Sequence, residues 1–161
     1  MLKVIIASFI AFSGLFLGML LAQIAPDEVK PGKKYFSILQ YMLSTAIAIV
    51  LLYNVINSQG QYLAIVASFA VGIILAMLLK IKYIYLGIGL FSSALAKDVF
   101  ALLASLIFIY SLPTGTLLVR KKVRLLLTSI LAFAISSMAL FMPLFNNYLA
   151  AFAAGALIGR K

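Results

Sequence analysis

Hydrophobic residues follow one another along this chain in long runs, and polar residues gather in short breaks between them. The runs form seven apolar segments, bounded to within a few residues: 4–25, 36–57, 62–79, 83–96, 99–119, 125–144 and 148–159. In membrane hydrocarbon every backbone polar group must be hydrogen-bonded within its own segment, which favours helices. The alternating polar positions typical of a membrane β-barrel are missing. The pattern therefore predicts an all-α fold: a polytopic transmembrane helical bundle of about seven spans.

Composition agrees with this interpretation. The chain is 66% hydrophobic and only 10% charged, whereas an ordinary soluble domain has roughly 25% charged residues. A soluble domain of this size would leave too much of that apolar surface in water. No polar stretch is long enough to fold outside the bilayer, so we expect residues 1–161 to form one integral membrane domain. The first run is too long for the apolar core of a signal peptide and is expected to be a retained helix.

The positions of the basic residues predict an orientation. If the amino terminus lies outside, eleven of the 13 Lys and Arg residues face the cytoplasm, and only Lys3 and Lys97 remain outside. The eleven are Lys30, Lys33, Lys34, Lys80, Lys82, Arg120, Lys121, Lys122, Arg124, Arg160 and Lys161. The positive-inside rule then favours seven spans, N-out and C-in, in the plasma or cytoplasmic membrane. The net charge of +10 is thus interpreted as basic loops facing anionic lipid head groups, and not as a nucleic-acid interface.

Two of the segments, 83–96 and 148–159, are short for a membrane span, which needs about 20 residues. Short helices at membrane depth are tolerated where protein shelters them or where they line a cavity. A locally thinned bilayer would also accommodate them, and the last segment could simply fray at its end. The sequence leaves these alternatives open.

Small residues recur at four-residue spacing on several segments, which lets helix backbones approach closely. The positions expected to carry such packing are Gly14, Gly18, Ser68, Gly72, Ser136 and Gly155. They serve either contacts within the chain or contacts with other membrane chains, in a homo-oligomer or a larger complex. Residues 61–72 also resemble residues 147–159, but these residue types are the commonest in membrane helices, which favours coincidence.

The absence of certain residue types argues against an enzyme. The chain has no His, no Cys and only three acids, which leaves no metal-ligand set and no His-based nucleophile. In the predicted orientation Asp27 and Glu28 are cytoplasmic and Asp98 is external, so the acids cannot form a catalytic pair. We therefore expect neither catalysis, nor a cofactor, nor a metal site.

Polar residues inside the apolar segments are the candidates for a solute or ion path. Ser37, Gln40 and Ser44 recur on one face of the second segment, where they either hydrogen-bond neighbouring helices or line a path. The adjacent Lys97 and Asp98 form either a solvated turn or an intramembrane site. The full set of path candidates is Gln40, Ser44, Asn54, Ser92, Ser93, Lys97, Asp98 and Thr114.

Two prolines are expected to shape the later segments. Pro113 removes a backbone donor and, with Gly115, predicts a kink or hinge. Thr114 and Thr116 are placed to satisfy the carbonyls that the proline frees. Pro143 is expected to end the sixth segment.

These observations favour a small membrane transporter or channel for a cation or small polar solute, working as an oligomer. The alternative is a non-catalytic scaffold subunit of a larger membrane complex, because the chain has many small-residue faces and almost no mass outside the membrane.

Overall fold

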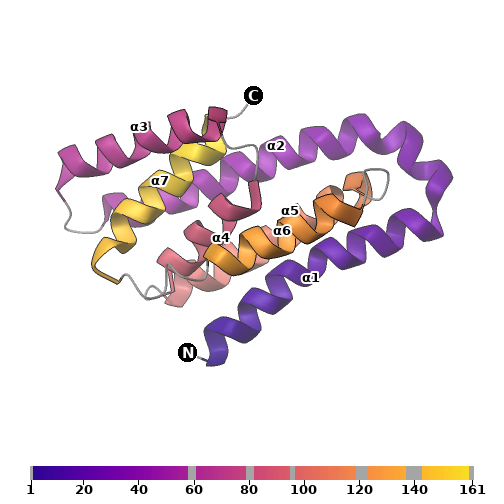
Figure 1. Ribbon diagram of the computed structural model, residues 1–161, viewed down its shortest axis with the longest axis horizontal. Coiled ribbons are helices and arrows are strands. Elements are labelled where there is room, and N and C mark those ends of the chain that lie inside the picture. The colour runs from indigo at the N-terminus through magenta and orange to yellow at the C-terminus, as the bar shows by residue number, and fades with distance from the viewer. Residues whose placement is uncertain are drawn as a thin grey trace.

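The computed structural model describes residues 2–57, 61–78, 82–94, 97–118, 123–136 and 143–159. Within these residues the protein is all-helical, with seven α-helices, one short 3₁₀ turn and no strand (Figure 1). The all-α prediction is confirmed. The helices are α1 (Leu2–Ile24), α2 (Pro26–Ile56), α3 (Tyr62–Leu78), α4 (Lys82–Ser92), α5 (Lys97–Leu118), α6 (Val123–Ser136) and α7 (Asn146–Ile158).

Three helices are long and apolar enough to cross a membrane. They contribute the stretches Ile6–Ile24 of α1, Pro31–Ile56 of α2 and Val99–Leu118 of α5, while the apolar α3 is shorter. The protein therefore carries helices suited to membrane insertion, in agreement with the predicted membrane association.

Helices α1 and α5 pack in parallel through a reciprocal glycine contact. A Cβ atom added to Gly18 would clash with the carbonyl oxygen of Leu112, and one added to Gly115 would clash with that of Leu15. Gly18 thus lies over Leu112, three residues before Gly115, and Gly115 lies over Leu15, three residues before Gly18. Gly14 lies in the same way over Phe108. Such close approach gains dispersion contacts and Cα–H···O interactions in a place where lipid supplies no hydrophobic driving force.

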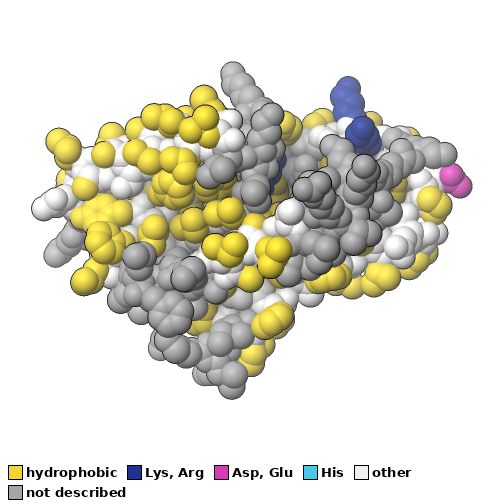
Figure 2. Space-filling view, viewed as in Figure 1, with side chains coloured by type: hydrophobic (Ala, Val, Ile, Leu, Met, Phe, Trp, Pro, Cys, Tyr) yellow, Lys and Arg dark blue, Asp and Glu magenta, His cyan; other side chains and the backbone are white. Residues whose placement is uncertain are grey.

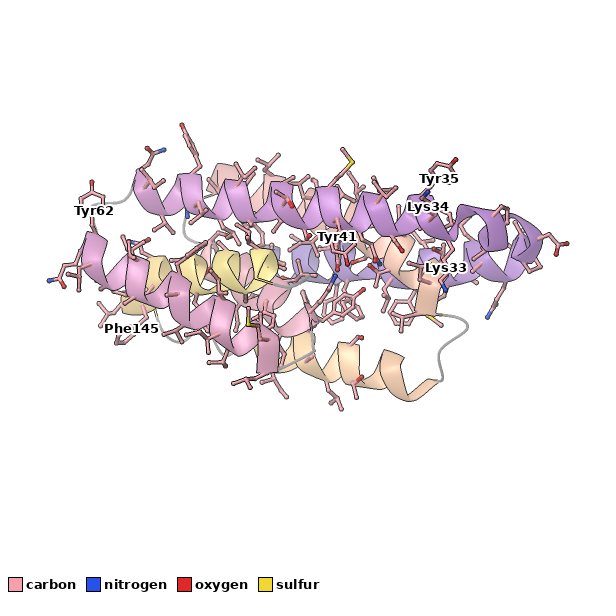
Figure 3. The ribbon with its side chains drawn as sticks, turned by 90° about the horizontal axis from the view of Figure 1, so that it is seen from above. Lys33, Lys34, Tyr35, Tyr41, Tyr62 and Phe145 are labelled. Atoms are coloured by element: carbon pink, nitrogen blue, oxygen red, sulfur yellow. The ribbon has the colours of Figure 1, made fainter. Side chains whose placement is uncertain are left out.

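The same reciprocal arrangement joins α3 and α7, which lie side by side in Figures 1 and 3. Gly72 lies over the carbonyl of Phe152, and Gly155 lies over the carbonyl of Phe69. Phe69 and Gly72 begin and end the sequence FAVG of α3, and Phe152 and Gly155 begin and end the sequence FAAG of α7. The two segments that resemble each other in sequence are therefore parallel packing partners.

The two shortest of the predicted segments form the interior of the bundle. α4 has 11 residues and α7 has 13, and most side chains of both are buried. At a rise of roughly 1.5 Å per residue, α4 extends about 16 Å, well short of a hydrocarbon layer about 30 Å thick. Its surroundings include α6, where Gly87 lies against Ser136. Of the alternatives left open by the sequence, both short helices are therefore sheltered by the rest of the chain.

Helix boundaries differ from the expectation in two places. Residues 26–35, predicted to be a connector, are helical, and Figure 1 shows α2 turning toward α1 over its first turns. Pro26 fits the first helical position, where no N–H is needed, and Pro31 lies inside the helix. α4 ends at Ser92, earlier than predicted, because the hydroxyls of Ser92 and Ser93 take up carbonyls of its last turn.

The sixth segment was predicted to end at Pro143. Residues 137–142, which precede Pro143, lie outside the described residues. Pro143 itself begins the 3₁₀ turn Pro143–Phe145, which leads directly into α7.

Candidate functional site

A group of buried and half-buried polar side chains lies where α2, α4 and α5 meet. We call it the polar node and define it as Gln40 of α2, Tyr83 of α4, and Tyr110, Ser111 and Thr114 of α5. On α5, Thr114 is four residues after Tyr110 and three residues after Ser111. These spacings make Thr114 a neighbour of both residues on the helix surface. The node therefore joins three helices at one level of the bundle.

A hydrogen bond between side chains links α2 to α5 at the node. The amide Nε2 of Gln40 donates to Oγ1 of Thr114 over 2.7 Å. The Thr114 hydroxyl in turn donates to the backbone carbonyl of Tyr110, at 2.9 Å. Thr114 is thereby oriented by its own helix and presents its oxygen to Gln40. Two of the residues expected to line a path are thus brought into direct contact.

Tyr83 brings a hydroxyl from α4 into the node. Its side chain is only 4% exposed, and its hydroxyl faces those of Ser111 and Thr114, with Tyr110 nearby. Neither the Tyr83 oxygen nor the fully buried Ser111 oxygen makes a well-formed hydrogen bond to any residue in the described ranges. Leaving a buried hydroxyl unbonded costs about 1–3 kcal/mol. The Ser111 and Thr114 hydroxyls are nonetheless the hydrogen-bonding neighbours of Tyr83, so a small polar molecule that entered the node would exchange with these contacts.

A cation–π contact joins α4 to α2. The Lys82 ammonium lies 5.4 Å from the centre of the Tyr41 ring. Lys82 precedes Tyr83 in sequence and Tyr41 follows Gln40, but neighbouring residues of a helix point about 100° apart, and the Tyr41 ring is exposed. In Figure 3 Tyr41 lies part-way along α2, between Lys33 and Lys34 at one end and the Tyr62 end of the bundle.

Three other predicted path residues bond to their own helices. Ser44 donates to the carbonyl of Tyr41, Ser92 to that of Gly89, and Ser93 to those of Gly89 and Leu90. All three serines are buried. Their hydroxyls are engaged in local backbone contacts, which is the ordinary role of serine in a membrane helix.

The remaining path candidates lie away from the node. Asn54 is half-buried and lies about 21 Å along α2 from Gln40, at roughly 1.5 Å per residue. Lys97 and Asp98 begin α5, about four turns before Thr114, and their side chains lie outside the described residues. Whether Lys97 and Asp98 form a solvated turn or an intramembrane site therefore stays a prediction.

The helix continues through Pro113 to Leu118. Pro113 has no N–H, so the carbonyl of Ile109 loses its usual donor. The two threonines bond elsewhere, since Thr114 donates to Tyr110 and Thr116 donates to Pro113 itself, at 2.8 Å. Gly115 packs against the backbone of Leu15 in α1, so the absence of a side chain at this position allows the two helices to approach closely. A hinge at Pro113 and Gly115 stays a prediction.

Sequence reasoning missed Tyr83, Tyr110 and Ser111 as members of this group. Tyrosine is common in apolar helices and gives no signal by itself. The available signal was the helical spacing of Tyr110 and Ser111 with Thr114, together with a Lys–Tyr pair at the start of an unusually short segment. No family model, curated protein or solved structure matches the chain.

Proposed function

We propose that the protein is a small multi-pass membrane transporter or channel whose solute passes the polar node. The observation that carries this proposal is the buried Tyr83 hydroxyl, which has the Ser111 and Thr114 hydroxyls as its polar neighbours but makes no well-aligned bond to either. It lies beside the interhelical Gln40–Thr114 bond. A solute with hydrogen-bonding groups would replace its hydration shell with the amide and hydroxyl groups of the node.

The node is built of neutral polar groups, the amide of Gln40 and the hydroxyls of Tyr83, Ser111 and Thr114. Such groups can replace the hydration shell of either class predicted from the sequence, a cation or a small polar solute.

The proposed topology has seven spans, N-out and C-in. Alternating spans require the odd-numbered helices to run in the same direction, and the parallel packing of α1 with α5 and of α3 with α7 supports this. The exposed Tyr35 and Tyr53 of α2 are about 27 Å apart along the helix, close to the roughly 30 Å of a hydrocarbon layer. Figure 3 places Tyr62 and Phe145 at the end opposite Lys33 and Lys34, as expected for interfacial aromatics and cytoplasmic lysines.

Because the chain has no cysteine, single-cysteine labelling tests this topology without background. We expect Gln61→Cys and Leu144→Cys to react with a membrane-impermeant maleimide on intact cells. Lys34→Cys should react only after the membrane is permeabilised. Labelling of Lys34→Cys on intact cells, or protection of Leu144→Cys beside labelled Gln61→Cys, would contradict the proposed arrangement.

A scaffold subunit is the second candidate. Its support is the large exposed apolar surface: Figure 2 shows hydrophobic side chains over much of one face, with the acidic side chain and the most prominent lysines at the end where α1 meets α2. Lipid covers such a surface equally well. The glycine faces that were candidates for partner binding are occupied by helices of the same chain, which weakens this alternative.

Mass spectrometry of the protein gently solubilised from its native membrane separates the two candidates. For the transporter we expect the purified material to contain copies of this chain and lipid, in keeping with the proposed homo-oligomer. A foreign membrane protein present at a fixed molar ratio would instead support the scaffold subunit. The function would then be sought in that partner.

A further inference from the structure

An apolar pocket lies between α1, α2 and α5, at the end of the bundle where α1 meets α2. Its volume is about 290 Å³, and it is partly open to the surface. Leu21, Val29 and Phe36 form its walls together with Ile109, Pro113 and Thr116 of α5. It is separate from the polar node, although Pro113 and Thr116 lie within a turn of Thr114.

The pocket suits hydrocarbon better than water. Thr116 is the polar side chain in its lining, and its hydroxyl already donates to the carbonyl of Pro113. Apolar cavities of roughly 150 Å³ stay free of water and bind benzene, and this one is nearly twice that size. It is large enough for a stretch of acyl chain and far too small for a helix.

The opening of the pocket faces the apolar flank of the bundle. Leu21, Leu39 and Ile109 all line it and are all partly exposed. They belong to α1, α2 and α5, the three helices long and apolar enough to span a membrane. A lipid chain can therefore enter sideways from the surrounding bilayer.

A basic residue lies on the same helical face as the pocket wall. Lys33 is four residues after Val29 and three before Phe36, and these spacings place the three side chains on one face. Lys34 points roughly 100° away around the helix. Figure 3 shows Lys33 on the side of α2 toward the other helices, with Lys34 and Tyr35 toward the opposite edge. The charge complements an anionic head group above an acyl chain.

We propose that this pocket binds one acyl chain of an anionic membrane phospholipid, with Lys33 contacting the phosphate of its head group. The bound chain packs against Pro113, where α5 has lost a backbone hydrogen bond. The lipid therefore braces the turn of α5 that carries Thr114.

Native mass spectrometry of the full-length protein tests this site. The purified protein is titrated with dioleoyl phosphatidylglycerol and, separately, with dioleoyl phosphatidylcholine, which has the same chains and no net charge. We expect one tightly bound phosphatidylglycerol. Lys33→Gln should weaken it about fivefold, the factor that corresponds to roughly 1 kcal/mol for a basic residue at an anionic surface. The neighbouring Lys34→Gln is the matched control and should change affinity less than twofold. Equal binding of both lipids, or equal effects of the two lysine variants, would overturn the role of Lys33.

A second pair of variants tests the pocket itself. Leu39→Trp fills the opening and should abolish the tight binding step, whereas Thr45→Phe, on the opposite face of α2, should leave it unchanged. Ala25→Phe fills the pocket from the other side and should give the same loss of binding. It serves as a second test in case Leu39→Trp fails to fold. Size-exclusion chromatography checks the folding of each variant. Retention of one bound lipid in both pocket-filling variants would show that the lipid lies elsewhere and would overturn the proposal.

Discussion

Replacing Gly18 with alanine should lower the free energy of unfolding by about 2–3 kcal/mol, the scale of overpacking in a tightly packed interface. The added methyl group would clash with the carbonyl oxygen of Leu112. Backbone atoms cannot rotate away as a flexible side chain can, so α1 and α5 would have to separate along their contact. Gly115→Ala should have a similar effect, because Gly115 lies over Leu15 at the same crossing. Unfolding in a denaturing detergent titration, followed by circular dichroism, measures the loss.

Gly32→Ala is the matched control, with an expected effect of opposite sign. The atoms nearest to a Cβ atom at Gly32 would belong to the ring of Phe36, a side chain that can move. Removing a glycine from inside α2 should stabilise the helix by about 0.5–1 kcal/mol. The two interface variants share one contact, so their combined effect should fall short of additivity. If Gly18→Ala left stability within about 0.5 kcal/mol of the original protein and instead released another chain, the glycine face would belong to a partner.

Replacing Gln40 with leucine should reduce solute flux through reconstituted vesicles at least tenfold. The change removes the donor to Thr114 and places a branched hydrocarbon side chain beside the Tyr83 and Ser111 hydroxyls. A hydrogen bond of this kind between membrane helices is worth only about 0.6 kcal/mol on average. Stability should therefore fall slightly while transport is lost.

The control for this change is Thr45→Val on the same helix. The Thr45 hydroxyl donates to the carbonyl of Tyr41 and is exposed on the outside of the bundle, so flux should stay within twofold. Thr114→Val removes the other half of the Gln40 bond and should resemble Gln40→Leu. Normal flux in both node variants, with correct folding, would exclude the node from the solute path. A loss of stability by several kcal/mol with proportional loss of flux would indicate a purely structural role.

The helical fold followed from sequence because an apolar run has few alternatives inside a membrane. The start of α2 was missed because residues 26–35 do not form an apolar run. Most of the described side chains of residues 26–35 are exposed, among them Lys33, Lys34 and Tyr35, and a helix with so few apolar residues gives little hydropathy signal. Two prolines in this stretch also favoured a connector, although Pro26 occupies the one helical position that suits proline.

The candidate site was predicted only in part. Gln40 and Thr114 were recognised as polar residues in apolar segments, but their pairing across 74 positions depends on how α2 and α5 pack. Tyr83 and Ser111 were missed because their importance lies in what surrounds their hydroxyls, which no local pattern encodes. Ser92 and Ser93 bond to the carbonyls of Gly89 and Leu90 in their own helix, and their part in a path stays a prediction.

The most direct test of the account is the permeability of vesicles that contain the purified protein. Stopped-flow light scattering would follow glycerol, urea, formate, acetate, potassium and sodium, with protein-free vesicles as the reference. The account predicts added permeability to at least one of these probes and loss of the added permeability in Gln40→Leu. Vesicles no more permeable than the protein-free reference to any probe, or an added permeability that Gln40→Leu leaves unchanged, would contradict it.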